Sequence, residues 1–354
     1  MTEELRFYFE PQEYYAAMRE AIASARHRVD LEMYIFASDA VGWAFAEQLA
    51  RKAQAGVEVR VSYDSVGSQG TSDELWLLLE ENGVRLREYN PTFPLPRNLR
   101  RRNHRKVLVV DDRIGFLGGF NLMDVNWRDT GVSFEGPELV AELRRQFELS
   151  WEHEFSRLRG MARRKIGRRP WQDGGLHLIP SFGLRRLSLI RQAYLTAIVR
   201  ARERVDITAA YFVPDLGILR ALRKAARRGR EVRLLTAGLS DVRVAQWASR
   251  AVYGKLLRAG VRIFEYQPRI LHAKSAVVDG RWFTVGTANL DHLSFFHNLE
   301  LNLFGTDVDS SQRLSERFEA DLRESAELRL EEWRRRSRWA RLKEQFCYAF
   351  RAWM

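Results

Sequence analysis

The chain has 354 residues, a hydrophobic content of 45% and a net charge of +12. This length and composition can bury a core large enough for about two domains, and the positive charge predicts an acidic partner, either nucleic acid or an anionic membrane surface. The single cysteine, Cys347, excludes an internal disulfide and every cysteine-based metal cluster, as is typical of a reducing compartment. No signal peptide opens the chain and no apolar run approaches the ~20 residues that span a bilayer. If the substrate is a lipid, we therefore expect the protein to approach it from the membrane surface and not from within the bilayer.

The first part of the chain alternates helical and strand patterns. Tyr14, Met18 and Ile22 recur at helical spacing, and residues 57–61 alternate apolar and charged side chains as a strand does. A strand, a helix and a second strand in succession predict a parallel pair with a crossover helix. The predicted elements are helices over 11–28, 41–55 and 73–82 and strands over 29–36, 57–61 and 84–89.

Residues 91–102 are predicted to form a loop, because they contain three of the nine prolines and then four arginines. An arginine run is usually a solvated surface. Here, however, Arg100, Arg101 and Arg102 directly precede a candidate phosphate-binding histidine. We expect them, together with Arg105, to recruit anionic headgroups or phosphate backbones.

The loop leads into a segment that reads His-x-Lys followed by four apolar residues and Asp111. Side chains on an extended strand alternate between faces, so His104 and Lys106 should point into one pocket. The apolar residues predict a buried strand with Asp111 at its far end. Behind the strand, Gly119 is small enough to let a phosphate approach the backbone, and Asn121 can donate amide hydrogens to phosphate oxygens.

The second half of the chain repeats the first after a predicted helix over 137–159 and a basic linker. Residues 205–212 match 29–36, and residues 260–266 match 83–89, so the repeat is a whole α/β lobe. We predict two tandem lobes, each a mixed β-sheet flanked by helices, related by a pseudo-twofold axis with the active site between them. The predicted segments are a first lobe over 1–165, a linker over 166–175, a second lobe over 176–330 and a basic amphipathic C-terminal helix over 331–354.

The second lobe carries a second copy of the motif. His272, Lys274 and Asp279 repeat the first copy, with Thr287 and Asn289 behind them. The two motif histidines lie 168 positions apart, and each asparagine follows its histidine by 17 residues. One copy would occur by chance in long proteins, and a lone strand histidine is more often a satisfied core group than a catalyst. The matching offsets instead predict a duplicated catalytic half-site.

At these residues the chain resembles the phospholipase D superfamily, whose signature is this repeated motif, and more narrowly the bacterial cardiolipin synthases, especially their type B branch. The resemblance covers roughly Tyr14 to Leu303. Its more detailed parts are the basic entry 100–106, the run 116–121, the segment 134–137 and the stretch 285–300. Two positions depart from the superfamily pattern, since Thr287 stands where serine is common and Leu293 where arginine is frequent.

The resemblance implies that one histidine attacks phosphorus to form a phosphohistidine, while the other protonates the leaving group and then activates the acceptor. It makes His104 the nucleophile and His272 the acid and base, an order that the near-symmetry leaves open. A histidine nucleophile needs one bare ring nitrogen, so its other nitrogen should donate to a carboxylate. Asp129 and Glu300 resemble the orienting carboxylates of the family. The rest of the predicted catalytic set comprises Lys106, Lys274, Asn121 and Asn289, which would stabilise the non-bridging oxygens, and Asp111 and Asp279, which look more like scaffold residues.

The acceptor decides the activity, because water would give a phospholipase or nuclease and a lipid hydroxyl a synthase. The resemblance implies that phosphatidylglycerol is both donor and acceptor, that glycerol leaves, and that a peripheral enzyme works at the cytoplasmic face of the bacterial cell membrane. We expect no metal and no cofactor. A phosphodiesterase or nuclease is the alternative: the positive charge favours nucleic acid as a partner, whereas the likeness to the synthases disfavours it without excluding it. A third hypothesis is a catalytically idle membrane-binding protein, and the oligomeric state stays open.

The C-terminal segment is rich in arginine and carries an apolar stripe. Trp339, Leu342, Phe346, Phe350 and Trp353 fall on one helical face at spacings of three and four residues. Such a stripe is most often the docking face of a helix on its own protein. With arginines on the other faces, it also matches an interfacial helix lying among lipid headgroups, and the sequence leaves both interpretations open.

Overall fold

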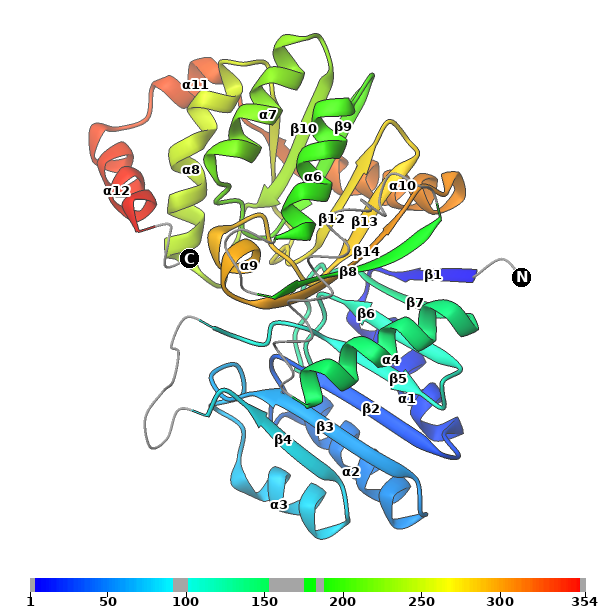
Figure 1. The fold of residues 1–354 in the computed structure, drawn as a ribbon. Helices are drawn as coiled ribbons and strands as arrows, with labels where there is room; N and C mark the ends of the chain where they lie inside the picture. Colours follow the sequence, from blue (N-terminus) through cyan, green and yellow to red (C-terminus); the bar gives the residue numbers. More distant parts are fainter. Residues whose placement is uncertain (1–3, 92–100, 153–174, 183–187, 351–354) are drawn as a thin grey trace.

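The computed structural model describes residues 4–91, 101–152, 175–182 and 188–350 (Figure 1). These residues form two mixed β-sheets, each flanked by helices, with one lobe stacked on the other (Figure 1). The predicted fold class is therefore confirmed. Arg100, Trp353 and nearly all of the predicted linker lie outside the described residues.

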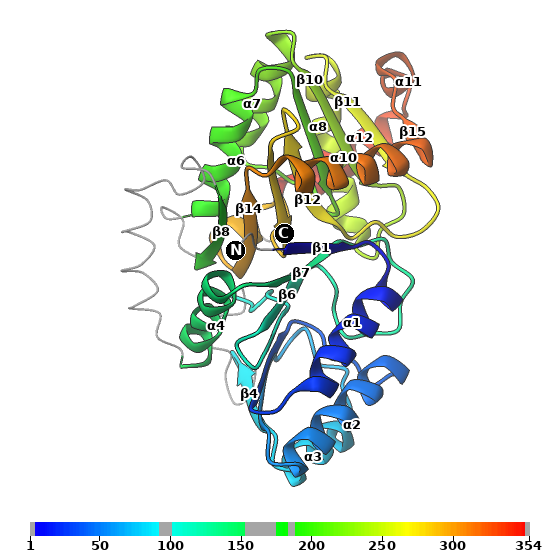
Figure 2. The same ribbon diagram turned by 90° about the vertical axis from the view of Figure 1, so that its right-hand side faces the viewer.

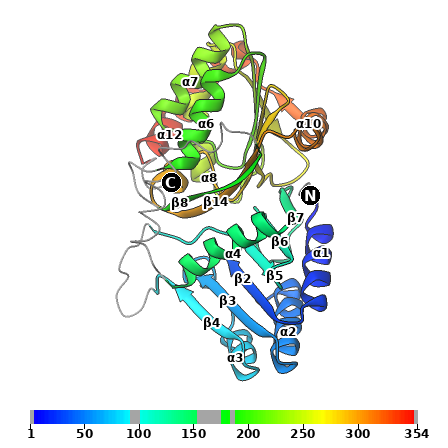
Figure 3. The same ribbon diagram turned by 45° about the vertical axis from the view of Figure 1, so that its right-hand side comes forward.

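The first lobe is a sheet of seven described strands in the order β1-β7-β6-β5-β2-β3-β4. Its parallel part comprises β2 (Arg28–Met33), β3 (Glu58–Asp64) and β4 (Arg85–Tyr89), and its antiparallel part β5 (Val107–Val110), β6 (Ile114–Gly118), β7 (Gly131–Glu135) and β1 (Glu4–Tyr8). The helices are α1 (Pro11–Ser24), α2 (Ala40–Gln54) and α3 (Asp73–Glu81) on one face and α4 (Pro137–Trp151) on the other (Figure 3). Alternation along β2 explains this layering, because Val29 and Leu31 pack under the first group while Glu32 faces α4.

The second lobe repeats this order, from the corresponding edge, as β8-β14-β13-β12-β9-β10-β11, with β15 added beyond β11. Its strands are β9 (Arg204–Ala209), β10 (Glu231–Ala237), β11 (Arg262–Tyr266), β12 (Lys274–Val278), β13 (Trp282–Gly286), β14 (Leu299–Gly305), β8 (Leu176–Phe182) and β15 (Ser325–Glu327). Its helices are α6 (Leu189–Arg200), α7 (Leu216–Arg227), α8 (Arg243–Leu257), α9 (His292–Phe296) and α10 (Val308–Arg323). Figure 2 shows α10 on the opposite side of the sheet from α6 and α7, in the place that α4 takes in the first lobe.

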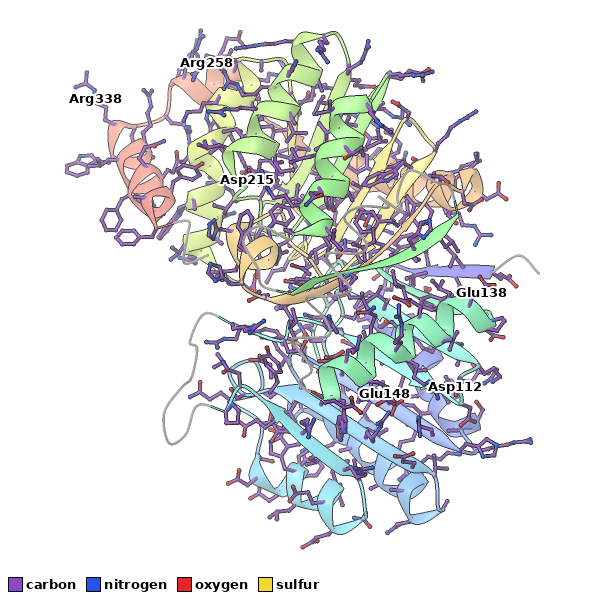
Figure 4. The ribbon with its side chains drawn as sticks, viewed as in Figure 1. Asp112, Glu138, Glu148, Asp215, Arg258 and Arg338 are labelled. Atoms are coloured by element: carbon purple, nitrogen blue, oxygen red, sulfur yellow. The ribbon has the colours of Figure 1, made fainter. Side chains whose placement is uncertain are left out.

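The duplication extends to a buried ion-pair chain in each lobe. In the first lobe, Nε of Arg60 lies 2.7 Å from Oδ1 of Asp30 on the neighbouring strand, and Nη2 of Arg60 lies 2.7 Å from Oε1 of Glu148. Figure 4 shows Glu148 on α4. The second lobe joins the same elements through Asp206, Arg233 and Glu319, with Arg233 again 2.7 Å from each carboxylate. A buried carboxylate needs such a partner, so the sheet and its covering helix are coupled in the same way twice.

The lobes share a hydrophobic core. Val107, Val109 and Leu117 of the first sheet pack in one cluster with Val285 and Leu301 of the second, and all are nearly inaccessible to solvent. This shared core places the two sheets so that the segments preceding β5 and β12 meet between the lobes. The motif histidines are in those segments.

The predicted single C-terminal helix over 331–354 is wrong. Two helices are present in this region, α11 (Leu330–Arg334) and α12 (Arg338–Ala349). The chain breaks between them because Ser337 is an N-cap, and its Oγ accepts a hydrogen bond from the nitrogen of Ala340 at 3.1 Å. The second helix, α12, then packs alongside α8 (Figure 1).

Candidate active site

The two motif histidines lie where the lobes meet, and each is tied by its backbone to the opposite lobe. The nitrogen of His104, just before β5, donates to the carbonyl oxygen of Leu299 on β14 at 3.0 Å. The nitrogen of His272, just before β12, donates to the carbonyl oxygen of Arg128 in the first lobe at 2.7 Å. The site is therefore assembled from both lobes at the level of the main chain.

The imidazole rings repeat this crossing. Nδ1 of His104 lies 3.1 Å from Oε2 of Glu300 in the second lobe, and Nδ1 of His272 lies 2.5 Å from Oδ2 of Asp129 in the first. Because a carboxylate accepts, each contact holds a proton on Nδ1 and leaves Nε2 bare. Each histidine is thus oriented by a carboxylate from the other lobe, although Asp129 follows His104 by only 25 residues in the sequence.

Burial sets the protonation states of these four groups, whose exposed fractions run from 0% for Glu300 to 8% for His104. Burial lowers the pKa of His104 to about 4, against the opposing effect of Glu300, and it also lowers the pKa of His272. Burial alone would raise the pKa of Asp129, but the charge of Lys274 and the hydrogen bond from His272 hold it below its ordinary value. Both imidazoles are therefore neutral near pH 7, as a nucleophile or a general base requires.

The motif lysines lie beside the histidines. Nζ of Lys106 donates to the carbonyl oxygen of His104 at 2.8 Å, and Nζ of Lys274 donates to that of His272. Burial lowers the pKa of both amines, to about 7 for Lys106. The ring of Tyr34 lies beside the first of these pairs, with its centroid 5.0 Å from Nζ of Lys106 and 4.8 Å from the centroid of the His104 ring. Two buried amines beside two histidines form a site that favours an anionic group.

The two motif asparagines follow the hairpins, as the sequence predicts. Oδ1 of Asn121 accepts a hydrogen bond from the nitrogen of Ile35 at 3.2 Å, which leaves its amide nitrogen as a donor. The nitrogen of Asn289 donates to Oγ of Ser294 at 3.1 Å, while its Oδ1 is buried without a partner among the described residues. A buried amide that lacks a partner is costly unless a ligand completes its hydrogen bonds.

Comparison with known proteins identifies the family. A family model described as cardiolipin synthase, PLD-like domain, matches residues 18–151 and 194–322, which include both histidine motifs and both carboxylates. The chain belongs to the PLD-like cardiolipin synthase family. This membership confirms the resemblance found in the sequence and makes the chain an enzyme of the phospholipase D superfamily, a phosphatidyltransferase.

Curated relatives agree with this assignment. Cardiolipin synthase of Halalkalibacterium halodurans is 34% identical over 350 residues, which cover 95% of this chain and 69% of that protein. Cardiolipin synthase B of Escherichia coli O6:H1 is 36% identical over 326 residues, which cover 86% of this chain and 76% of that protein. Cardiolipin synthase 2 of Bacillus anthracis is 34% identical over 339 residues, 92% of this chain and 65% of that protein.

A solved structure shares the two-lobed fold. The crystal structure of phosphatidylserine synthase from Haemophilus influenzae has a TM-score of 0.74 to this chain, with 14% sequence identity, and the match covers 99% of this chain and 95% of that one. The likeness therefore extends over both lobes.

The basic entry of this cardiolipin synthase family member differs in part from the prediction. Arg105 is wholly buried, and its Nη1 donates to the carbonyl oxygen of Gln146 on α4 at 3.2 Å, which differs from the exposed position expected of a headgroup contact; the contact itself remains a prediction. Arg102 stays near the site, because its carbonyl oxygen accepts from the nitrogen of Leu299 at 2.8 Å. Arg101 is half-buried beside it. A headgroup contact by Arg101 and Arg102 remains a prediction.

The motif aspartates occupy scaffold positions, as their place in the motif suggested, and a catalytic part for either remains a prediction. Asp111 lies beyond the far end of β5 and accepts hydrogen bonds from the three backbone nitrogens of residues 26–28 at 2.7–2.8 Å. Asp279 does the same for residues 202–204 at 2.8–2.9 Å. A strand rises about 3.3 Å per residue, so the seven residues from His104 to Asp111 keep that carboxylate away from the reacting atoms. The predicted tight turn at Asp279 is present, with a φ of 53°.

Gly119 and Thr287 contact the two orienting carboxylates, and their predicted contact with substrate remains a prediction. A Cβ at Gly119 would lie 2.0 Å from Oδ1 of Asp129, so the missing side chain makes room for that carboxylate. Oγ1 of Thr287 donates to Oε2 of Glu300 at 2.5 Å. Both residues therefore support the carboxylates that contact the two histidines.

Three residues of the site were missed by sequence reasoning. The ring of Trp127 lies 5.2 Å from that of His272. Nη2 of Arg128 lies 2.7 Å from Oδ2 of Asp321 on α10, which ties the segment before Asp129 to the second lobe. Asp291 is buried at the start of α9, and burial raises its pKa to about 7. Each of them lies within two residues of Asp129 or Asn289 in the sequence, and this closeness to a predicted site residue could have identified them.

The described residues contain no group of three or more histidine, cysteine, aspartate or glutamate side chains that could hold a metal ion. Across the same residues, every helix is too short or too polar to cross a bilayer.

Proposed function

We propose that the protein is a peripheral enzyme at the cytoplasmic face of the bacterial membrane that makes cardiolipin by phosphatidyl transfer between two phosphatidylglycerol molecules. The observation that carries the proposal is the pair of buried histidines, each with Nδ1 held by a carboxylate of the opposite lobe. The names of the curated relatives supply the lipid class. Two histidines that share one anion-binding site fit a reaction in two displacements at phosphorus.

In the first displacement, the lone pair on Nε2 of His104 attacks phosphorus and the bond to the glycerol oxygen breaks. Nε2 of His272 gives its proton to that oxygen, so glycerol leaves neutral and a phosphohistidine remains. The protonated form of His272 is favoured when the anionic phosphodiester binds beside it and Asp129 stays ionised. Lys106 and Lys274 would stabilise the charge on the non-bridging oxygens.

In the second displacement, Nε2 of His272 takes a proton from the hydroxyl of the second phosphatidylglycerol. The resulting oxygen attacks phosphorus, the P–N bond breaks, and Nε2 of His104 regains its lone pair. The side-chain amide nitrogens of Asn121 and Asn289, which follow the two hairpins, would donate hydrogen bonds to the phosphate oxygens in both steps. Both displacements need water to be excluded, because water would divert the phosphohistidine to phosphatidic acid.

The test is to incubate the purified protein with phosphatidylglycerol vesicles and a chelator, and to follow lipid products and free glycerol by mass spectrometry. We expect cardiolipin and glycerol in equal amounts from the wild type and neither from His104→Ala. The matched control is His27→Ala, the same substitution at an exposed histidine outside the site, which should retain the activity.

Other products would contradict the proposal in different ways. Phosphatidic acid with glycerol and no cardiolipin would make water the acceptor. Turnover of a nucleic acid or a soluble diester, with phosphatidylglycerol left intact, would replace the synthase by a phosphodiesterase.

A further inference from the structure

Helix α12 carries an apolar face that the protein leaves open to solvent. The exposed fractions are 80% for Trp339, 60% for Leu342, 65% for Phe346 and 47% for Phe350. Spacings of three and four residues place these side chains on one side of the helix, and Figure 4 shows side chains of α12 that project away from α8. Large apolar residues that share one exposed face mark an interaction site.

This face is separate from the one by which α12 docks on its own lobe. Cys347 packs against Ala248 in a small buried cluster, and Glu344 is also buried. Nε2 of Gln345 donates to the carbonyl oxygen of Ala251 at 3.2 Å. Tyr348 packs against the same cluster, so the docking face of α12 consists of residues other than the four of the exposed stripe.

The charges around the stripe are those of an anion-binding surface. From Arg329 to Ala349 the chain has seven arginines or lysines and three glutamates. Arg336 pairs with Glu344 at 2.5 Å, whereas Arg334, Arg335 and Arg338 have no carboxylate within ion-pair distance in the described part of the chain. Arg338 extends outward from the outer end of α12 (Figure 4). An apolar stripe with free cations beside it is complementary to anionic lipid headgroups over acyl chains.

The stripe also leads toward the active site. Trp333, which precedes α12, has its ring 5.4 Å from that of Tyr253 in the second half of α8. Cys347 packs against Ala248 in the first half, so α12 runs antiparallel to α8 and toward its beginning.

Further exposed apolar residues lie at that end of α8: Leu239 in the preceding loop, Val242 at the N-cap and Val244 in the first turn. Within this loop, Asp241 accepts a hydrogen bond from the hydroxyl of Tyr211 at 2.6 Å, and the Tyr211 ring is 6.2 Å from that of His272.

We propose that Trp339, Leu342, Phe346 and Phe350, continued by residues 239–244 at the start of α8, form a membrane-docking ridge that seats the second lobe on an anionic bilayer. Resting on the proposed function, the ridge brings the His272 side of the site to the level of the lipid headgroups. Aromatic and leucine side chains enter the headgroup boundary, and the arginines stay with the phosphates.

The first test places an environment-sensitive fluorophore on the ridge. Cys347→Ala removes the single native thiol, and Leu342→Cys then carries the label. The matched control is Leu77→Cys on α3 of the first lobe, where the native leucine is 51% exposed. Vesicles that contain phosphatidylglycerol should shift the emission of the label at position 342 to shorter wavelength and expose it to a lipid-borne quencher, while the label at 77 stays unchanged. A label at 342 that remains in water while the protein sediments with the vesicles would overturn the proposal.

The second test removes the apolar character of the ridge. Trp339→Asp, Leu342→Asp and Phe346→Asp together should weaken sedimentation with phosphatidylglycerol vesicles by at least about tenfold. The control combines Leu77→Asp, Val199→Asp and Val308→Asp at residues with similar exposure on other helices, and it should bind as the wild type does. His104→Ala should also bind normally, so vesicle binding is measured independently of turnover.

The remaining outcome concerns a second copy of the chain. If sedimentation velocity shows a dimer that the triple ridge variant dissociates, with vesicle binding unchanged, the ridge is a protein interface and the proposal fails. Deleting the whole segment is a poorer test, because Trp333 and Cys347 belong to buried clusters and their loss would expose α8.

Discussion

Gly119 and Thr287 occupy equivalent positions, each 15 residues after its motif histidine, yet they support their carboxylates in different ways. In the first lobe the carboxylate is the short side chain of Asp129, which needs a close approach to the backbone that only glycine permits. In the second lobe the longer Glu300 reaches further, and the hydroxyl of Thr287 holds it at 2.5 Å.

This difference supports the proposal of different tasks for the two histidines. Asp129 lies 2.5 Å from Nδ1 of His272 and its pKa is held below the ordinary value, so a full negative charge is available to stabilise a protonated His272. Oε2 of Glu300 serves both Thr287 and His104, and its contact with His104 is longer at 3.1 Å. The divergence of the half-sites therefore supports His272 as the acid and His104 as the neutral nucleophile.

The largest effect is expected from Asp129→Asn. The amide cannot fix the tautomer of His272 or stabilise its cation, so we expect kcat to fall by about 10³-fold or more. Glu300→Gln should reduce kcat less, because His104 acts as a neutral group. Asp124→Asn, at an exposed aspartate nearby, is the control and should leave kcat unchanged. Steady-state kinetics on phosphatidylglycerol measures all three variants, and equal losses for Asp129→Asn and Glu300→Gln would remove the asymmetry.

Gly119→Ala tests the close approach of Asp129. Its Cβ would lie 2.0 Å from Oδ1 of that carboxylate, so the carboxylate must move and His272 loses its alignment. We expect kcat to fall by about a hundredfold, with the fold retained by circular dichroism. Gly70→Ala is the matched control, since nothing lies within 4 Å of a Cβ there. Wild-type activity in Gly119→Ala would mean that Asp129 does not need this position.

Thr287→Val removes the hydroxyl from Glu300 and keeps the shape of the side chain. A hydrogen bond to a charged group contributes about 1.5–3 kcal/mol, part of which the active site retains by rearrangement. We therefore expect about a tenfold loss of kcat/KM, with Thr287→Ser close to wild type. A Thr287→Val enzyme as active as Thr287→Ser would show that Glu300 is held by other groups.

The pH dependence should show the smallest but most specific effect. Burial lowers the pKa of His104 to about 4, so the reactive neutral imidazole persists from neutral pH down to about pH 5 and is lost as the pH falls through 4. We expect the acidic limb of kcat/KM near pH 4, measured on a short-chain micellar substrate. A limb near pH 6.5 would show that His104 titrates as an exposed histidine.

The sequence predicted the repeated lobe and the residues of the two histidine motifs because strand alternation and matched offsets are local features. Alternation also contained a signal that was not used: if His104 and Lys106 share a face, Arg105 must point the other way, and it does, toward α4. The crossing of the carboxylates could not be predicted, because it depends on how two lobes dock and not on sequence distance.

The roles of the small residues were also beyond local reasoning. Gly119 suggested room for a phosphate, whereas the space is filled by Asp129 ten residues later. The outward direction of the α12 stripe was likewise undetermined, since helical spacing shows that Trp339 and Phe346 share a face but not what that face meets.

The most direct measurement of the central claim is to trap the covalent intermediate. The His272→Ala protein is incubated with phosphatidylglycerol, digested, and searched by mass spectrometry for a phosphatidyl adduct, in parallel with the His104→Ala protein. We predict that an adduct accumulates on His104 in the first protein and that none forms in the second. An adduct on His272 in the His104→Ala protein would reverse the two roles and contradict the account of how the half-sites differ.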